Sequence, residues 1–355
     1  MKIGLTYDLR DDYLAAGFRE EETAEFDRPE TIDAIEAALR QLGYQTDRIG
    51  HLRNLVARLA AGERWDLVFN VAEGLSGFGR EAQVPALLEA YEVSYTFADL
   101  LAASLTLHKG MTKRVLRDLG LPTPAFVEVA SEADIARVDL PFPLFVKPIA
   151  EGTAKGIDGR SKIDTRGELY RACRRVLRQF RQPAIVERFL PGREFTTGII
   201  GSGQQAFVVG TLEIELLPQA EPHAYTYMNK ERSEELCRYS PAPSPWAERA
   251  AELSLAAWRG LGGRDAGRVD LRADIDGDLQ ILEVNPLPGL HPTHSDLPMI
   301  CTAAGMPYVE LIRRIVESAA KRIPDAPPRA WLAPAKRRVT APRVPPRPRK
   351  RAARP

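Results

Sequence analysis

Long apolar runs are absent from this sequence of 355 residues. A helix needs about 20 consecutive apolar residues to cross a bilayer, and no stretch approaches that length. The start of the chain, MKIGLTYDLRDDY, is too polar and acidic for a signal peptide and reads instead as a first strand. The sequence therefore predicts a cytoplasmic protein without a membrane span.

Cysteine is also scarce. The three cysteines, Cys173, Cys237 and Cys301, are far apart, odd in number and without the spacing of a metal-binding motif. This pattern argues against a disulfide framework and against a cysteine-based zinc site. It is typical of a protein in a reducing compartment, and we assign none of the three a catalytic role.

An excess of charge of either sign is missing from the chain as a whole, whose net charge is +1. The balance is uneven, because residues 324–355 contain eight Arg, two Lys and a single Asp, which leaves the preceding body at −8. The same 32 residues hold nine prolines, a composition that cannot bury a core. This tail is either a disordered, solvated extension or an arm for nucleic acid, anionic lipid or an acidic partner.

The rest of the chain has an ordinary globular composition, with 44% hydrophobic and 27% charged residues. Over residues 1–98, short apolar strands alternate with segments of helical periodicity. Strands are predicted at 2–7, 44–49, 65–71 and 93–96, and helices at 29–42, 51–61 and 80–91. This order predicts an open α/β sheet with parallel strands.

Later segments continue the mixture of helices and strands. Helices are predicted from 107 to 120 and at 165–179, 245–261 and 308–322, and strands at 142–147, 184–187 and within 194–218. Residues 223–240 have many polar groups and little periodicity, which is typical of a lid over a site.

A lysine and a glycine-containing loop follow the strand at 142–147. Lys147 ends this apolar strand, and a buried lysine is costly unless it meets an anion. The loop after it contains Gly152, Thr153 and Gly156, which offer backbone N–H groups and a hydroxyl to a phosphate. The loop is not of the Walker type, because the lysine precedes the glycines.

The stretch from Arg268 to Pro298 is the most informative in the chain. It predicts two alternating strands joined by an Asp-Gly turn, with Asp270 beside Arg268 on one face and Glu283 beside Asn285 on the return strand. Two carboxylates and an amide oxygen are hard ligands of the kind that Mg²⁺ prefers. The simpler interpretation is a surface hairpin with ordinary charged residues.

This stretch resembles the metal-binding end of the ATP-grasp fold, in its D-alanine–D-alanine ligase branch. That branch has the pattern R-x-D, then E-x-N-x-x-P-G, then H-S-x-x-P. The matching positions here are Arg268, Asp270, Glu283, Asn285, Pro288, Gly289, His294, Ser295 and Pro298. Their order and spacing are specific, and matches upstream extend the resemblance over nearly all of residues 1–323.

The resemblance implies a fold of the α/β class, in which an open parallel sheet precedes the two α+β lobes of an ATP-grasp domain. The expected units are an N-terminal α/β domain at 1–98, a central lobe at 99–187, a C-terminal lobe with the metal site at 188–323, and the tail at 324–355. It also implies a homodimer formed through the first unit.

The resemblance further implies a nucleotide site, with Mg²⁺ or Mn²⁺ held by Asp270, Glu283 and Asn285. The residues expected to bind ATP are Lys109, Lys147, Gly152, Thr153 and Gly156 at the phosphates, Glu187 and Leu190 at adenine, Glu194 at ribose, and Lys230 in the lid. Without the resemblance, Glu187 and Glu194 would be interpreted as charged residues that only keep strand ends soluble.

At several positions the sequence departs from the family pattern. The family's Gly-Ser-Ser loop is here Gly152-Thr153-Ala154, with Lys155 added. Its usual His-Gly after a strand is Glu73-Gly74, which is equally consistent with a plain strand-to-loop exit. Glu231 stands where the lid lysine is often followed by tyrosine.

The first loop of the family carries a Glu that helps to hold the amine of the first substrate. Its equivalent cannot be assigned within the acidic segment 11–27. Glu20, Glu21 and Glu22 are candidates, although a solvated charge run is the simpler interpretation.

The implied reaction is ATP-dependent ligation of two amino acids through an acyl phosphate, as in D-alanine–D-alanine ligase or a close relative. Arg268 and the Gly289 N–H would stabilise the oxyanion, and Ser295 with His294 would bind the carboxylate of the second substrate. One alternative is a ligase for other amino acids or peptides. Another is a non-catalytic nucleotide-binding protein that acts through its basic tail.

Overall fold

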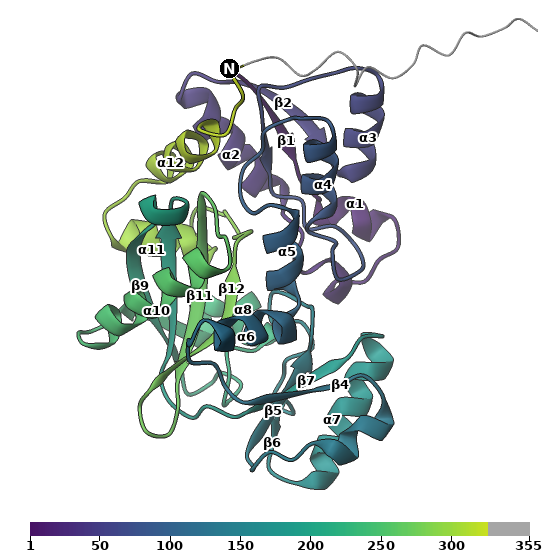
Figure 1. The fold of residues 1–355 in the computed structure, drawn as a ribbon, viewed down its shortest axis with the longest axis vertical. Coiled ribbons are helices and arrows are strands. Elements are labelled where there is room, and N and C mark those ends of the chain that lie inside the picture. The colour runs from purple at the N-terminus through teal and green to yellow at the C-terminus, as the bar shows by residue number, and fades with distance from the viewer. Residues whose placement is uncertain (326–355) are drawn as a thin grey trace, which may run out of the picture.

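The computed structural model describes residues 1–325, and the first of its sheets is parallel (Figure 1). Its strands run in the order β2-β1-β3, with β1 at Lys2–Thr6, β2 at Gln45–Gly50 and β3 at Leu67–Asn70. The helices of this unit are α1 (Arg10–Ala15), α2 (Pro29–Gln41), α3 (Leu52–Ala60) and α4 (Gln83–Ala90). The predicted open parallel sheet is thus confirmed.

Local sequence signals explain these elements. Helix α2 starts with Pro29 in its first turn, where the missing N–H costs nothing, and buries Ile32, Ile35 and Leu39 on one face. The strand predicted at 93–96 is wrong, because only a single bridge joins Tyr95 to Val68. The chain leaves the sheet at Phe97, which has φ 71° and donates its N–H to Asp265 Oδ2.

The second sheet is antiparallel and lies at the opposite end of the molecule (Figure 1). Its order is β4-β7-β5-β6, from β4 (Phe126–Val129), β5 (Leu144–Pro148), β6 (Lys162–Ile163) and β7 (Ala184–Arg188). Helix α7 (Arg166–Gln179) packs on it and begins with a capping box between Thr165 and Glu168. Two helices, α5 (Leu100–Leu107) and α6 (Lys109–Asp118), connect it to the first unit.

The third sheet has five strands in the order β10-β9-β8-β11-β12. They are β8 (Glu194–Ile200), β9 (Phe207–Leu216), β10 (Cys237–Pro241), β11 (Ala266–Ala273) and β12 (Leu279–Asn285). Helix α10 (Trp246–Gly260) covers one face through Phe195 and Ile199, and α11 (Asp296–Ala303) covers the other. A Cβ at Gly198 would lie only 3.0 Å from Ile300, so glycine there suits the close approach of α11.

The polar segment at 223–240 has more regular structure than its sequence indicates. It contains α8 (Tyr227–Glu231) and α9 (Ser233–Leu236), followed by β10, which pairs with β9. Asn229 is fully buried and donates to the carbonyls of Glu221 and Ala224. The segment is therefore a folded cover that lies beside the site.

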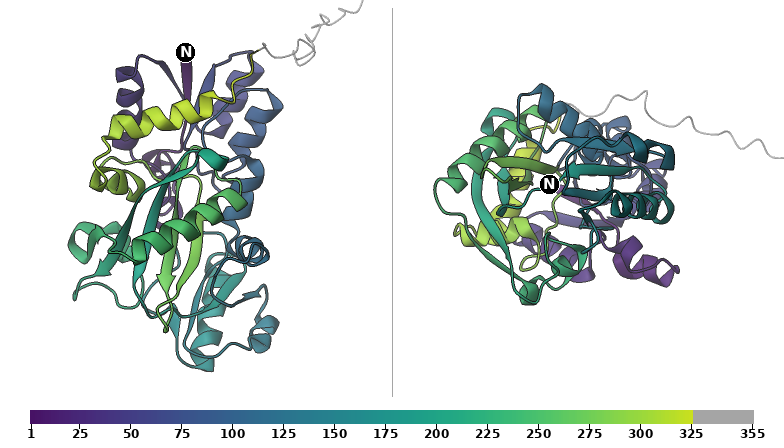
Figure 2. Two further views of the ribbon diagram at one scale, coloured as in Figure 1. Left: turned by 60° about the vertical axis from the view of Figure 1, so that its left-hand side comes forward. Right: turned by 90° about the horizontal axis from the view of Figure 1, so that it is seen from below.

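The last described helix, α12 (Tyr308–Ala320), returns to the N-terminal unit (Figure 2). Its apolar face, with Leu311, Ile312 and Ile315, shares one core with Ile3 and Ile35 of the first unit. The N-terminal core therefore depends on residues more than 300 positions away. The domain boundaries at 98, 187 and 323 remain predictions.

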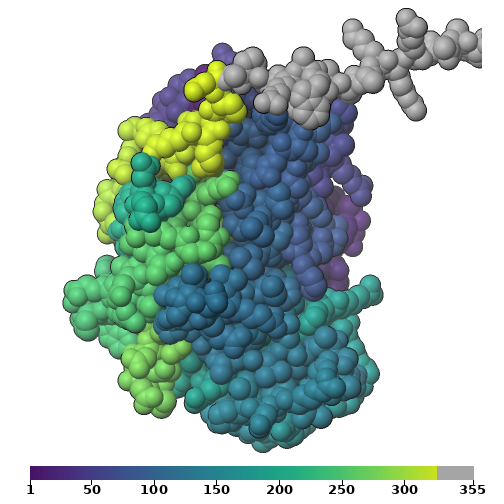
Figure 3. All heavy atoms as spheres, in the orientation of Figure 1, coloured from purple at the N-terminus to yellow at the C-terminus, as the bar shows by residue number. Residues whose placement is uncertain are grey.

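The three units meet along extended contacts on the face shown in Figure 3. None of the helices within residues 1–325 has the length and apolar character needed to cross a membrane. The predicted tail lies almost entirely outside the described residues.

Candidate active site

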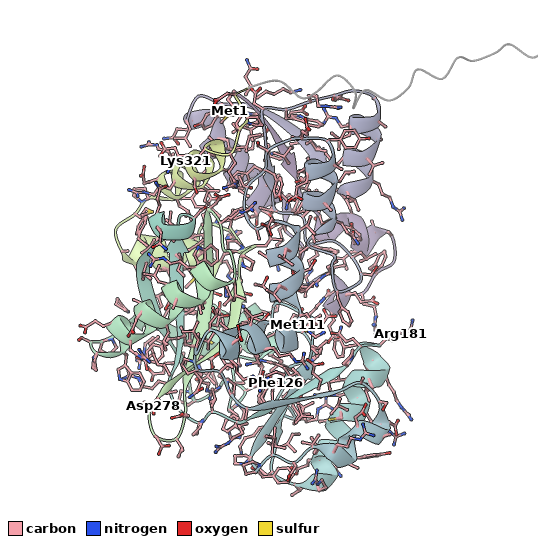
Figure 4. All side chains as sticks on the ribbon, in the orientation of Figure 1. Met1, Met111, Phe126, Arg181, Asp278 and Lys321 are labelled. Atoms are coloured by element: carbon pink, nitrogen blue, oxygen red, sulfur yellow. The ribbon has the colours of Figure 1, made fainter. Side chains whose placement is uncertain are left out.

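The hairpin of β11 and β12 presents the predicted acidic face. Its register sets Arg268 opposite Asn285 and Asp270 opposite Glu283, and opposite residues in an antiparallel pair share a face. Asn285 Nδ2 donates to Asp270 Oδ2 at 3.2 Å, and Thr196 of β8 donates to Asp270 Oδ1 at 2.8 Å. The turn is remote from this face, since Asp278 lies at the free tip of the hairpin (Figure 4).

The two carboxylates of the hairpin have opposite electrostatic surroundings. Burial is the main cause that raises the pKa of Asp270 to about 6, and the negative charge of Glu283 adds to it. Burial also acts to raise the pKa of Glu283, but Lys109 and Lys147 outweigh it and lower that pKa. A cation placed between these carboxylates would relieve their repulsion.

The donor set fits a metal that arrives with phosphate ligands. Within residues 1–325, no group of three or more His, Cys, Asp or Glu side chains forms a metal site. Asp270 and Glu283 provide two carboxylates and Asn285 an amide oxygen. Mg²⁺ commonly binds one or two carboxylates together with substrate phosphates, so this incomplete oxygen set is consistent with it.

Buried lysines face the hairpin from the other lobe. Lys109 Nζ lies 3.5 Å from Glu283 Oε2 and donates to the Glu151 carbonyl, and Lys147 Nζ lies 3.1 Å from Glu187 Oε2. The sequence predicted both lysines but missed Lys113, which lies fully buried 3.0 Å from Glu187 Oε1. Burial is the main cause that lowers the pKa of Lys113 to about 8.

Glu187 has unused hydrogen-bonding capacity at the end of β7. Its Oε1 atom is buried and lies 3.0 Å from Lys113 Nζ, but it accepts no hydrogen bond of good geometry within residues 1–325. A carboxylate oxygen has two lone pairs, so this atom can accept a further hydrogen bond from a ligand.

The loop after β5 has the backbone geometry of an anion-binding nest. Thr153 and Ala154 both have positive φ, 46° and 54°, which is uncommon for residues other than glycine. Their N–H groups donate to no acceptor within the described part of the chain. Such consecutive free donors form a concave site for phosphate.

One cavity brings most of the predicted nucleotide residues together between the second and third sheets. Its lining includes Lys109, Lys147, Glu187, Leu190, Glu194, Lys230, Asp270 and Glu283. Gly152, Thr153, Arg268, Asn285 and Gly289 line an adjoining cavity together with Lys109 and Glu283. Gly156 lines neither cavity, and a Cβ at this position would lie 2.7 Å from Pro148 and 2.8 Å from Phe180.

A third cavity lies beyond the hairpin and beneath the polar segment, and it is lined by Arg268, Gly289, His294 and Ser295. Ser295 Oγ accepts a hydrogen bond from the His291 N–H at 2.9 Å and would lie 2.8 Å from a Cβ at Gly289. The predicted catalytic residues are therefore adjacent to one another.

The sequence prediction missed Asp296, which begins α11. Its Oδ2 accepts from Arg268 Nη1 at 2.6 Å and lies 3.7 Å from Lys230 Nζ. Burial acts to raise the pKa of Asp296, but Arg268 and Lys230 lower it overall. Its position directly after Ser295 was a signal that could have identified it.

The prediction also missed Glu25 of the first loop. Glu20, Glu21 and Glu22 are exposed, whereas the Glu25 side chain is only 5% exposed and reaches the loop after β5. Its Oε1 accepts from the Gly152 N–H at 2.6 Å. The segment 20–25 contains four glutamates, and the sequence alone does not show which of them is buried.

Glu73 and Glu231 are two of the departures from the family pattern. Glu73 lines the cavity that adjoins the nucleotide cavity, and Glu231 lines the third cavity. Glu73 lines the cavity that contains Gly152 and Asn285. Glu231 Oε2 lies 3.7 Å from Arg10 Nη1 across the third cavity. Both side chains therefore face positions where small substrates would bind.

Comparison with known proteins agrees with this geometry. Residues 115–317 match the family model described as D-ala D-ala ligase C-terminus. The chain is 34% identical over 301 residues to the D-alanine–D-alanine ligase of Bordetella avium, covering 83% of this chain and 90% of that protein. The chain belongs to the D-alanine–D-alanine ligase family. The resemblance predicted from the hairpin motif is thus confirmed.

Solved structures of this ligase family share the fold. The Bacillus anthracis D-alanine–D-alanine ligase in complex with ATP superposes with a TM-score of 0.69 at 21% identity, covering 90% of this chain and 98% of that one. The VanG D-Ala:D-Ser ligase of Enterococcus faecalis gives 0.69 at 19% identity, covering 90% and 99%. The predicted ATP-grasp fold is therefore confirmed.

Proposed function

We propose that this protein is an ATP-dependent, ADP-forming D-alanine–D-alanine ligase. The observation that supports this most directly is the single face of Arg268, Asp270, Glu283 and Asn285. That face meets Lys109 and Lys147 across a cavity. It combines the charges required for phosphoryl transfer with an adjoining cavity for a carboxylate substrate.

The nucleotide would lie between the second and third sheets. Lys109, Lys147 and the free N–H groups of Thr153 and Ala154 would bind its phosphates. The adenine would contact Leu190 and donate a hydrogen bond from its amino group to Glu187 Oε1, which lies 3.0 Å from Lys113 but accepts no hydrogen bond of good geometry within the described residues. Glu194 would bind the ribose and Lys230 would close over the phosphates.

Asp270, Glu283 and Asn285 would hold Mg²⁺ or Mn²⁺. A divalent cation bound there supplies neutralisation of the charge that develops during transfer of the γ-phosphoryl group. The fit rests on the two carboxylates and one amide oxygen that share a face of the hairpin. We no longer propose that Gly156 binds the nucleotide. It allows the loop to pass close to Pro148 and Phe180, which leave no space for a Cβ.

The chain's own residues would then serve the two chemical steps. The carboxylate of the first amino acid attacks the γ-phosphorus, ADP leaves, and an acyl phosphate forms. The amine of the second amino acid attacks the acyl carbon and phosphate leaves. Arg268 and the Gly289 N–H would stabilise the tetrahedral oxyanion, and Ser295 would bind the second carboxylate.

A ligase for a different pair of amino acids is the second candidate. It is favoured by Glu73 and Glu231, which line the substrate cavities, and by Lys155, which pairs with the cavity residue Glu25. The related fold of a D-Ala:D-Ser ligase is consistent with a changed second substrate. The catalytic face would be the same in both cases.

The test is ADP and phosphate release from ATP and Mg²⁺ with single amino acids and pairs, combined with mass analysis of the product. Release with D-alanine alone, together with the dipeptide, is the expected result. Release only with another pair would replace the substrate and keep the mechanism. No release with any pair would overturn the ligase proposal.

We further propose a cytoplasmic homodimer, in keeping with three buried, unpaired cysteines. The division into units at 1–98, 99–187 and 188–323 belongs to the same proposal.

Removal of residues 326–355 distinguishes a ligase from a binder that acts through its tail. A ligase keeps its turnover, whereas a tail-dependent binder loses its nucleic acid or acidic partner.

A further inference from the structure

The carboxylate of Asp296 lies between two cations that serve different cavities. Lys230 lines both the nucleotide cavity and the third cavity, whereas Arg268 lines the third cavity and the one that adjoins the nucleotide. Asp296 Oδ2 accepts a hydrogen bond from Arg268 Nη1 at 2.6 Å, and the same atom lies 3.7 Å from Lys230 Nζ. One oxygen atom therefore connects the arginine proposed for the oxyanion with the lysine proposed for the phosphates.

The backbone around Asp296 is held in place by packing. Asp296 is the first residue of α11, where the helix dipole favours a negative charge. The next residue, Leu297, is fully buried, and together with Cys301 it belongs to the core shared with the N-terminal unit. The Asp296 side chain is itself only 7% exposed. The carboxylate therefore keeps its position when one of its two cations moves away.

Arg268 relies on Asp296 for its orientation. Its other carboxylate partner is Asp270, whose Oδ2 lies 3.4 Å from Arg268 Nη2. We have proposed that Asp270 holds a divalent cation, which would compete with Arg268 for that carboxylate. Asp296 lies outside the metal-binding face, so its shorter hydrogen bond remains available to hold the guanidinium group in place.

Lys230 is held less tightly than Arg268. The backbone of α8 is fixed by the buried Asn229, which donates to the carbonyls of Glu221 and Ala224. The Lys230 ammonium group, by contrast, lies 5.3 Å from the centre of the Tyr225 ring and is farther from Asp296 than a hydrogen bond allows. A flexible four-carbon stem can carry this group to a phosphate, and only the attraction of Asp296 and the ring opposes that movement.

We propose that Asp296 is a positioning residue with two opposite effects on the reaction. It holds Arg268 in the orientation needed for the ligation step, and it restrains Lys230, which ATP must draw away before the lysine can bind its phosphates. Asp296 thus increases turnover and weakens the binding of ATP. This inference rests on the proposed ligase function and adds a residue that acts through Arg268 and Lys230.

Both effects depend on the negative charge of Asp296. Burial acts to raise its pKa, but Arg268 and Lys230 outweigh burial and lower that pKa overall, so the carboxylate is ionised at neutral pH. Asp296→Asn removes the charge while it keeps the size of the side chain and an oxygen that can accept from Arg268. This substitution therefore tests the charge and leaves the packing of α11 in place.

The test measures ATP binding and turnover separately. Isothermal titration calorimetry with ATP and Mg²⁺, without any amino acid, gives the Kd, and ADP release at saturating D-alanine, or at saturating concentrations of the amino acids that the wild type uses, gives kcat. In Asp296→Asn we expect kcat to fall about tenfold, because a hydrogen bond to a charged group is weakened. The Kd for ATP should fall about two- to fivefold, because Lys230 loses a weak ion pair. Damage to the fold would instead weaken ATP binding and lower kcat together.

Two further variants make the result specific. In a Lys230→Gln background, Asp296→Asn should still lower kcat but should no longer tighten ATP binding, because the restrained cation is gone. Glu248→Gln removes an exposed carboxylate from the first turn of α10 and should change neither constant.

The outcomes separate this inference from the proposed function. A Kd for ATP that does not fall in Asp296→Asn, or a kcat that does not fall, would overturn the inference alone. A wild type that binds ATP but releases no ADP with any amino acid would overturn the proposed function. The inference about Asp296 would then be decided by the ATP affinities of the wild type and Asp296→Asn.

Discussion

Two pairs of buried carboxylates, Glu187 and Glu283 at the nucleotide end of the cleft and Glu81 and Asp27 at the amino-acid end, have opposite electrostatic surroundings. At the nucleotide end, lysines outweigh burial and lower the pKa values of Glu187 and Glu283. At the amino-acid end, burial raises the pKa values of Glu81 and Asp27, each to about 7. Lysines therefore neutralise the first two carboxylates, whereas Glu81 and Asp27 lie near further carboxylates, although their neighbour Glu25 is paired with Arg80 and Lys155.

This difference corresponds to the charges of the proposed ligands. Phosphates bring negative charge and can take over Lys109 and Lys147 from their carboxylate partners. An amino acid brings an ammonium group and can supply the cation that the acidic cavity needs. The metal-binding motif of the family is complete, whereas Thr153-Ala154 in the phosphate loop and Glu73, Lys155 and Glu231 depart from the pattern. We infer that the chemistry is retained while the fit to the amino acids is changed.

The largest effect is expected from removal of charge at the nucleotide end. Asp270→Asn and Glu283→Gln keep side-chain size but weaken the binding of the divalent cation. ADP release should fall about 100-fold or more, as for the loss of a preorganised charge-stabilising group. The measurement is turnover at saturating ATP over a range of Mg²⁺ concentrations.

Asp276→Asn at the hairpin turn is the matched control, because it removes a carboxylate from the same hairpin at an exposed position. It should retain wild-type turnover. Circular dichroism should show that all three variants keep their secondary structure. A folded Glu283→Gln enzyme with most of its activity would contradict the metal assignment.

The second prediction concerns stability at the amino-acid end. Glu25→Gln leaves Arg80 and Lys155 buried with a neutral partner, and breaking a buried ion pair costs about 3 to 5 kcal/mol. We expect a loss near the lower limit, about 3 kcal/mol, since Lys155 keeps Glu151. Urea denaturation followed by fluorescence measures it, and a variant as stable as the wild type would show that Glu25 is not an internal counter-ion.

The contrast between the two ends also explains what could be predicted from sequence. The acidic face of the hairpin was predictable, because strand alternation fixes which residues share a face and the turn is local. The pairing of Glu25 with Arg80 and Lys155 was not, since it joins three separate segments. The packing of α12 on the first sheet was likewise hidden, because its apolar stripe shows that a face is buried but not against which partner.

A smaller effect is expected at Glu231. Its ion pair with Arg10 is long, at 3.7 Å, and the Glu231 side chain is 29% exposed. Glu231→Tyr restores the residue common in the family and should lower the KM of the second D-alanine about two- to fivefold, a change comparable to a weak ion pair. If the KM rises instead, Glu231 contributes to recognition of a different second substrate. Glu215→Gln on β9, an exposed position outside the three cavities of the site, is the control.

A further prediction is a pH dependence of stability caused by Asp27. Burial and the nearby Asp8 raise its pKa to about 7 from an ordinary value of 3.8, so the folded protein holds a proton that the unfolded chain releases. Stability should therefore decrease as pH rises from about 4 to 7 and then level off. Asp27→Asn cannot ionise, and it should be about 1 to 2 kcal/mol more stable than the wild type at pH 8 but not at pH 4. The side chain is partly exposed, which keeps this value below that of a fully buried group. The measurement is the urea midpoint of the wild type and of Asp27→Asn at both pH values. If the difference between the two proteins is the same at pH 4 and pH 8, ionisation of Asp27 does not reduce stability.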